Sequence, residues 1–179
     1  EHRDLDRIVE VFEHRGVERP FDLDYGGTMR ATFHDAGHIL GSVGVTIETE
    51  GKRIMYTGDV NFEDSTVQKG ALFPEDHVDA LIVETTRGAQ ARRDGYTRRD
   101  EENAFAEGIA EVLARHGSVL IPVFAMGKTQ EVLAMLNRFK EEARIPWKTP
   151  VYIGGLSTKM THIYDRFADT SRRNLAGFR

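Results

Sequence analysis

Two short segments of the sequence place side chains that can bind metal beside glycine. In the first, residues 33–42, His38 follows Gly37, and in the second, residues 56–59, Asp59 follows Gly58. Imidazole and carboxylate groups bind hard or borderline divalent cations, and an aspartate can bridge two of them. Glycine lets the backbone turn sharply and approach other groups closely. By spacing alone, these segments are either metal-ligand loops or ordinary turns.

The composition limits which residues can bind a metal and which kinds of protein this can be. The 179 residues include no cysteine, so the sequence excludes disulfides and thiolate metal sites, and any metal must be bound by His, Asp or Glu. A net charge of −5 argues against a protein that coats nucleic acid through bulk positive charge. The sequence has no apolar run of membrane-spanning length and no signal peptide, so we expect no membrane association and a cytoplasmic location.

In the first half of the chain, predicted strands flank the two segments that hold His38 and Asp59. An apolar stripe predicts a helix over residues 1–14. Alternating apolar and polar residues predict strands over 29–34, 43–48 and 53–56, with Glu50 and Gly51 turning a hairpin between the last two. The unbroken apolar run over 80–83 predicts a strand that is covered on both faces.

The second half alternates helix and strand. The spacing of its apolar residues predicts helices over 97–115, 130–142 and around 160–167, a buried strand over 118–124 and a further strand over 151–153. Thr97 and Asp100 form a predicted capping pair. This alternation favours parallel strand pairing with helical crossovers, and a domain junction is expected near residues 88–97.

Four motifs, in this order, resemble those of a known family. Residues 36–42 (Ala-Gly-His, then Gly-Ser) and 56–59 (Tyr-Thr-Gly-Asp) resemble the third and fourth metal motifs of the metallo-β-lactamase fold. Residues 81–88 (Leu-Ile-Val-Glu-Thr-Thr-Arg-Gly) resemble the acidic motif that opens the β-CASP insertion, and 119–131 resemble the strand-turn-helix that follows it. The sequence is thus similar to the β-CASP nucleases, which include RNase J and the nuclease subunit of the cleavage and polyadenylation machinery.

The resemblance implies an α/β fold class with two parts. Residues 1–90 would be the later part of a metallo-β-lactamase αββα sandwich, and residues 91–179 the start of a Rossmann-like β-CASP domain. It also implies that His38 binds one zinc ion, that Asp59 bridges two zinc ions, and that Glu84 orients a downstream histidine acting as general acid. The alternatives are a scaffold that has lost its metal and, for Glu84, an ordinary exposed carboxylate.

Part of the family pattern is missing. The fold's His-x-His-x-Asp-His motif should precede residue 38, yet the upstream histidines, His2, His14 and His34, lack that spacing. We expect His34 to face solvent or cap a strand. The family's two later histidine motifs would lie beyond the insertion. The resemblance therefore implies an internal piece of a larger enzyme, inactive in isolation.

Basic residues mark a candidate nucleic-acid contact. Residues 87–99 hold five arginines against Asp94, a local net charge of +4. We predict that Arg87, Arg92 and Arg93 contact phosphates, with a solvated basic loop as the alternative. Lys128 begins a predicted helix, where backbone N–H groups and a cation favour an anion. Simple helix initiation is the alternative there.

The sequence-based hypothesis is therefore a zinc-dependent ribonuclease that hydrolyses phosphodiester bonds of single-stranded RNA during processing or decay. Endonuclease and exonuclease action, and DNA in place of RNA, stay open. A second copy of the chain or a processing complex are the expected protein partners. The alternatives are a metallo-β-lactamase-fold hydrolase of a small ester, thioester or lactam, and a non-catalytic scaffold paralogue.

Overall fold

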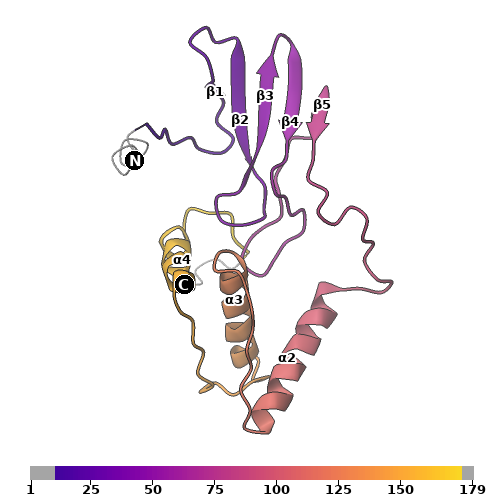
Figure 1. Ribbon diagram of the computed structural model, residues 1–179, viewed down its shortest axis with the longest axis vertical. Coiled ribbons are helices and arrows are strands. Elements are labelled where there is room, and N and C mark those ends of the chain that lie inside the picture. Colours follow the sequence, from indigo (N-terminus) through magenta and orange to yellow (C-terminus); the bar gives the residue numbers. More distant parts are fainter. Residues whose placement is uncertain (1–10, 175–179) are drawn as a thin grey trace, which may run out of the picture. The chain divides into compact units, whose positions relative to one another are not determined.

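The computed structural model describes residues 11–174 as a mixed α/β chain (Figure 1). The helix expected over 1–14 falls mostly outside the described residues, and residues 11–14 are not helical. The chain forms two compact units. Of the described residues, the first unit comprises 11–36, Ser42–Val60 and Leu72–Glu84, and the second comprises Gly37–Gly41, Asn61–Ala71 and 85–174.

The first unit contains a five-stranded sheet in the order β1-β2-β3-β4-β5 (Figure 1). The first three pairings are antiparallel and the β4–β5 pairing is parallel. The expected strands and hairpin are confirmed, because alternation and a two-residue turn specify local antiparallel pairing. The strands are β1 Phe21–Asp22, β2 Met29–Asp35, β3 Val43–Thr49, β4 Lys52–Tyr56 and β5 Ala80–Ile82.

One face of this sheet buries a row of side chains that includes a histidine. His34, Thr46 and Met55 are all buried. His34 Nε2 lies 2.8 Å from the Thr46 hydroxyl and His34 Nδ1 lies 3.0 Å from the Glu18 carboxylate. The expectation that His34 faces solvent or caps a strand is therefore wrong. The fold can bury the ring at little cost because both nitrogens have hydrogen-bond partners within the unit.

The expectation that β5 is covered on both faces is also wrong. Leu81 and Ile82 are 58% and 55% exposed. Within residues 11–174, β5 pairs only with β4, so it forms an edge of the sheet. An apolar run shows that a strand can be buried, but it does not supply the element that covers it.

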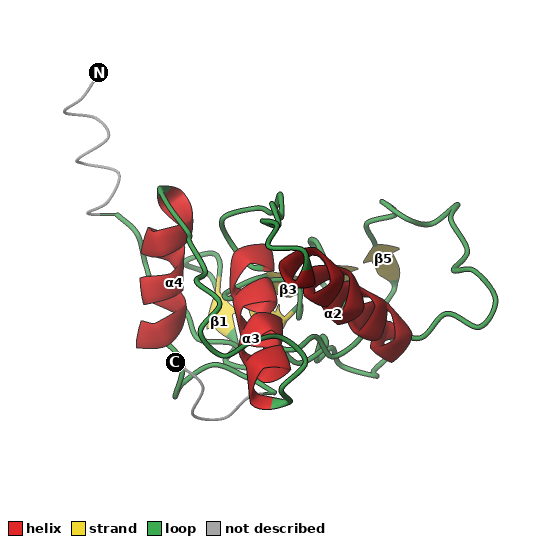
Figure 2. Ribbon diagram, turned by 90° about the horizontal axis from the view of Figure 1, so that it is seen from below, coloured by secondary structure: helices red, strands yellow, loops and turns green. Residues whose placement is uncertain are grey.

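The second unit contains α2 (Arg98–Ala114), α3 (Lys128–Glu141) and α4 (Leu156–Arg166). Figure 2 shows the three helices, and α3 contacts both of the others. The predicted cap is confirmed, because the Asp100 N–H donates to the Thr97 hydroxyl oxygen at 3.1 Å. Within residues 11–174, none of the helices is both long enough and apolar enough to cross a membrane.

The helices of this unit bury a small core. Phe139 is fully buried, and its ring packs edge-on against that of Phe105 with centroids 6.0 Å apart. The buried residues that share this cluster are Ala106, Ile109, Leu136, Phe139 and Ile145. The apolar stripes of the sequence therefore identify the buried faces of α2 and α3 correctly.

The two strands expected in this unit do not form. Over 118–124 and 151–153, the described structure has no strand, and Leu120, Phe124 and Tyr152 are 92%, 82% and 88% exposed. A strand needs a partner for its backbone N–H and C=O groups. The described residues place no strand beside either segment, so the predicted parallel pairing is absent from this part of the chain.

Candidate functional site

Two of the predicted site residues follow neighbouring parallel strands. Tyr56 and Ile82 pair where the parallel strands β4 and β5 end. Asp59 and Glu84 therefore follow the carboxyl ends of two neighbouring strands. The Thr57 N–H donates to the Ile82 carbonyl at 3.0 Å, and the Val60 N–H donates to Glu84 Oε1 at 3.4 Å. The Glu84 carboxylate therefore lies beside the backbone that directly follows Asp59.

The turn before Asp59 is closely constrained. Gly58 has a φ of +58°, and a Cβ there would lie 2.9 Å from the Val43 carbonyl oxygen. Thr57 is buried, and its hydroxyl donates to the Gly58 carbonyl at 2.8 Å. Asp59 itself is exposed, and within the described part of the chain its carboxylate makes no hydrogen bond or ion pair. A fixed turn thus presents an exposed carboxylate that has no hydrogen-bond or ion-pair partner among residues 11–174.

His38 belongs to the second unit, in the loop 37–41. Gly37 has a φ of +64°, and a Cβ there would lie 2.4 Å from the Ala71 nitrogen. The Leu40 N–H donates to the Tyr164 hydroxyl oxygen at 2.9 Å, and the Tyr164 side chain is buried. Segments far along the chain, 61–71 and α4, therefore hold the loop, while His38 is exposed.

Replacing Tyr164 by Phe is expected to loosen this loop. The Leu40 N–H would lose its acceptor, which should lower the free energy of unfolding by about 1 kcal/mol and speed amide exchange at Leu40. Amide hydrogen exchange and denaturant titration measure both effects. Tyr152→Phe is the matched control, because Tyr152 is 88% exposed. Equal exchange rates at Leu40 in the two variants would show that the bond does not hold the loop.

The predicted ligands do not by themselves form a metal centre. Asp59 and Glu84 are brought together within the first unit, whereas His38 lies in the second. Among residues 11–174, no three His, Asp or Glu side chains are grouped so that they could hold a metal ion. Both nitrogens of His34 are engaged by Glu18 and Thr46. The described residues therefore supply too few grouped donors to hold two zinc ions by themselves.

We accordingly expect the 179-residue chain to retain fewer than two zinc ions per molecule. A stable zinc site takes three or four protein ligands, and each missing donor weakens it sharply. Elemental analysis after dialysis against zinc-free buffer measures the stoichiometry, with a zinc-retaining protein carried through as the positive control. Two zinc ions per chain, lost together in Asp59→Ala, would show that these residues complete the site.

The candidate phosphate contacts differ in their surroundings. Arg92 lies 2.5 Å from Glu63, and their mutual hydrogen bond raises the pKa of Arg92 and lowers that of Glu63. Arg93 pairs with Glu101, and Arg87 is exposed. A phosphate would therefore have to compete with a carboxylate for Arg92 and Arg93. On the surface such ion pairs are weak enough to exchange.

Lys128 is exposed at the first position of α3. The N–H groups of residues 127, 128 and 129 already donate to Gln130 Oε1 and to the carbonyls of Met126 and Phe124. An anion here would therefore bind through the Lys128 side chain rather than through these three backbone donors. That Lys128 contacts phosphate stays a prediction.

A buried carboxylate that the sequence did not predict is Glu131, in the first turn of α3. Its oxygens accept hydrogen bonds from the N–H groups of Thr66 at 2.6 Å and Val67 at 3.0 Å, and it pairs with Arg98. Burial alone would raise the pKa of Glu131, but these hydrogen bonds and the Arg98 charge outweigh it and lower the pKa. An acidic residue in the first turn of a helix was the only available signal.

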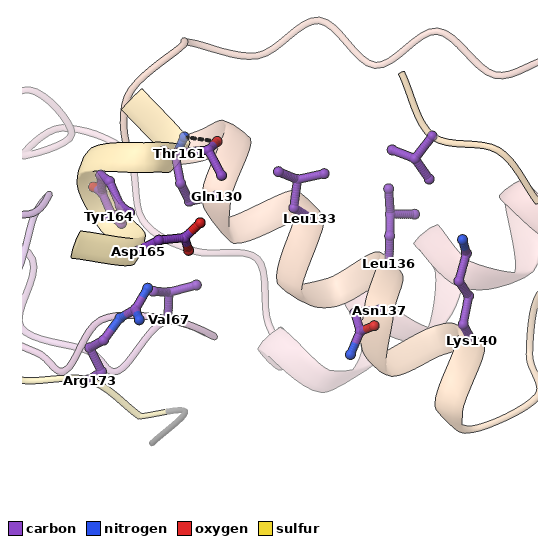
Figure 3. A pocket seen from close by; sticks show the side chains of 11 residues that line it. Val67, Gln130, Leu133, Leu136, Asn137, Lys140, Thr161, Tyr164, Asp165 and Arg173 are labelled. Atoms are coloured by element: carbon purple, nitrogen blue, oxygen red, sulfur yellow. Dashed lines mark hydrogen bonds between the residues drawn. The ribbon is translucent and has the colours of Figure 1, made fainter. Parts of the chain in front are cut away.

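A pocket of about 280 Å³ lies between α3 and α4 (Figure 3). Its lining mixes apolar side chains with Gln130, whose amide donates to the Thr161 hydroxyl at 3.0 Å. The other lining residues are Val67, Leu133, Leu136, Asn137, Lys140, Val151, Tyr164, Asp165 and Arg173. None of the residues predicted to bind metal or RNA lines this pocket.

The sheet with acidic side chains at the carboxyl ends of β4 and β5 defines a mixed α/β protein with a strand-end site. No protein-family model matches the chain. It is 36% identical over 132 residues to the RNase J-like protein of Methanocaldococcus jannaschii, covering 74% of this chain and 31% of that protein. It is 37% identical over 136 residues to cleavage and polyadenylation specificity factor subunit 3 of Dictyostelium discoideum, covering 76% and 17% respectively.

A third relative covers more of the chain. Integrator complex subunit 11 of Danio rerio is 36% identical over 164 residues, which are 91% of this chain and 26% of that protein. The chain belongs to the β-CASP family of metallo-β-lactamase-fold nucleases. It spans between 17% and 31% of the length of these three relatives.

Proposed function

We propose that the protein containing this chain is a metal-dependent hydrolase that cleaves phosphodiester bonds of single-stranded RNA. Relatives named RNase J-like protein and Endoribonuclease YSH1 support the reaction and the substrate. The structural observation that carries the proposal is the contact between Glu84 and the backbone at Val60. It brings the acidic motif against the turn that presents Asp59.

The proposal assigns roles to three residues. His38 and Asp59 are ligands of a two-zinc centre whose remaining donors lie outside the described residues, and Glu84 orients a neighbouring group. The hydrogen bond from the Val60 N–H supports the role of Glu84, because a carboxylate fixed by a backbone N–H can hold a polar partner in one orientation. We also propose that residues 1–90 are the later part of a metallo-β-lactamase sandwich. Residues 91–179 are then the start of a Rossmann-like β-CASP domain.

Relatives named as subunits of larger assemblies suggest a protein partner. Cleavage and polyadenylation specificity factor subunit 3 and Integrator complex subunit 11 both carry such names. We therefore include a multisubunit RNA-processing complex among the proposed partners. Copurification of the full-length protein from its own cells tests for the protein complex. RNA sequencing of the material that copurifies tests for bound RNA.

The direct test is hydrolysis by the full-length protein. We expect cleavage of single-stranded RNA that stops when a chelator removes divalent metal and resumes when zinc is returned. Matched single-stranded DNA, a thioester and a β-lactam serve as comparison substrates. Hydrolysis of the small substrates without RNA cleavage would contradict the proposed substrate. RNA cleavage that survives the chelator would contradict the metal.

Removing the positive charges of Arg92 and Arg93 together is expected to weaken RNA binding by the full-length protein. Each lost contact to a single-stranded phosphate should lower the slope of log K against log salt concentration by about 0.7. Fluorescence anisotropy with labelled RNA at several salt concentrations measures affinity and slope. The control replaces Arg115 and Arg166, exposed at the ends of α2 and α4, and removes the same charge. Equal slopes in the two double variants would exclude the contact.

A further inference from the structure

A second pocket, rich in arginine, lies in the helical unit. It has a volume of about 500 Å³ and is lined by four arginines, two from the start of α2, one from α3 and one from the segment after α3. The arginines are Arg98, Arg99, Arg138 and Arg144, and the other lining residues are Ser65, Thr66, Glu102, Asn103 and Glu142. The sequence analysis singled out neither Arg138 nor Arg144, because they lie about forty residues beyond the basic stretch.

The protein itself orients three of these arginines. Glu102, with a side chain only 14% exposed, accepts from Arg98 Nε at 2.8 Å and from Arg138 Nη2 at 2.5 Å. Arg144 donates to the Asn103 side-chain oxygen at 2.9 Å and to the Asn103 carbonyl at 3.1 Å. Side chains held in place before binding lose less conformational entropy when a ligand arrives. The guanidinium groups are therefore preorganised around the pocket.

The carboxylates near the pocket do not neutralise it. Glu102 and Glu142 balance two of the four positive charges, and Glu131, which pairs with Arg98 beside the pocket, balances a third. Glu142 is 3.9 Å from Arg144, at the limit of an ion pair. Among the described residues, no carboxylate lies within ion-pair distance of Arg99. The pocket keeps net positive charge in a chain whose own net charge is −5.

We infer that this pocket binds a phosphate group of an RNA chain. Arginine forks match the tetrahedral oxygens of a phosphate, and their weak hydration favours such contacts over water. The choice of RNA as the source of the phosphate rests on the proposed function. The pocket is distinct from the predicted contacts at Arg87, Arg92, Arg93 and Lys128, none of which lines it. It gives the RNA a second point of attachment, on α2 and α3.

The test measures binding of a labelled single-stranded RNA to the full-length protein at several salt concentrations. Arg99→Ala should weaken binding and lower the salt slope by about 0.7, since one phosphate contact is lost. Arg144→Lys should also weaken binding. The positive charge stays, but the planar guanidinium group that can donate two parallel hydrogen bonds to a phosphate is lost. Arg115→Ala, at the opposite end of α2, should leave affinity and slope unchanged. Arg99 is exposed, so denaturation curves should show wild-type folding for Arg99→Ala.

The other outcomes separate the pocket from the proposed function. Wild-type RNA binding that is unchanged in both pocket variants would overturn the pocket while leaving the ribonuclease proposal standing. Orthophosphate binding that is lost in Arg99→Ala, without RNA binding by the wild type, would identify a free anion as the ligand and overturn the RNA source. A wild-type protein that binds neither RNA nor orthophosphate would overturn both inferences.

Discussion

Asp59→Ala should abolish RNA cleavage by the full-length protein and leave the free energy of unfolding of its metal-free form almost unchanged. The Asp59 carboxylate is exposed and makes no hydrogen bond within the described residues, so its loss should cost no more than about 0.5 kcal/mol of stability. A residue of the reaction centre is commonly worth several kcal/mol of transition-state stabilisation. A loss of about 4 kcal/mol corresponds to roughly a thousandfold fall in kcat/KM.

The control for this substitution is Asp94→Ala, which removes an exposed aspartate from a loop of the helical unit. Single-turnover cleavage of labelled RNA by the zinc-loaded proteins and denaturant titration of the metal-free proteins should be measured on both variants. Activity lost in Asp59→Ala and kept in Asp94→Ala, with equal unfolding curves, is the expected pattern. Cleavage by Asp59→Ala within a few-fold of the wild type would exclude this residue from the reaction centre. A large loss of stability would reassign it to the fold.

Local patterns predicted the elements of this structure that depend on local contacts. The hairpin of β3 and β4 follows from alternation across a two-residue turn, and the start of α2 follows from Thr97. The strand predictions over 118–124 and 151–153 were wrong, because a strand forms only when a neighbouring strand pairs with its backbone N–H and C=O groups. Their apolar residues show a capacity for burial, and the described structure leaves Leu120 and Tyr152 exposed. Nothing in a single segment encodes which neighbour will satisfy its backbone.

The candidate site likewise has residues that the sequence could predict and residues that depend on distant partners. Asp59 and Glu84 could be paired from the sequence only through family resemblance, and the parallel register of β4 and β5 then supplies the physical reason for their proximity. The roles of Tyr164 and Glu131 could not be predicted. Tyr164 accepts from Leu40 across 124 positions of sequence and Glu131 from Thr66 across 65, and no periodicity connects such distant partners.

Glu131→Gln should destabilise the helical unit by about 2–3 kcal/mol. The charged carboxylate accepts from the Thr66 and Val67 N–H groups, and an amide in its place would turn an NH₂ group toward one of those donors. The Arg98 side chain is 42% exposed, so solvent screens that ion pair and the two backbone hydrogen bonds account for most of the loss. Glu107→Gln, on the exposed surface of α2, is the matched control in denaturant titrations.

The pH dependence gives this prediction a second, independent measurement. The pKa of Glu131 is lower in the folded protein than its usual value near 4.5, so the unfolded chain binds its proton more readily. The stabilisation is therefore complete above about pH 5 and is lost as the pH falls from the unfolded pKa through the folded one. The stability gap between wild type and Glu131→Gln should narrow on acidification over that range. A gap that stays constant down to pH 3 would mean that the charge of Glu131 contributes nothing, and that packing alone explains the effect of the substitution.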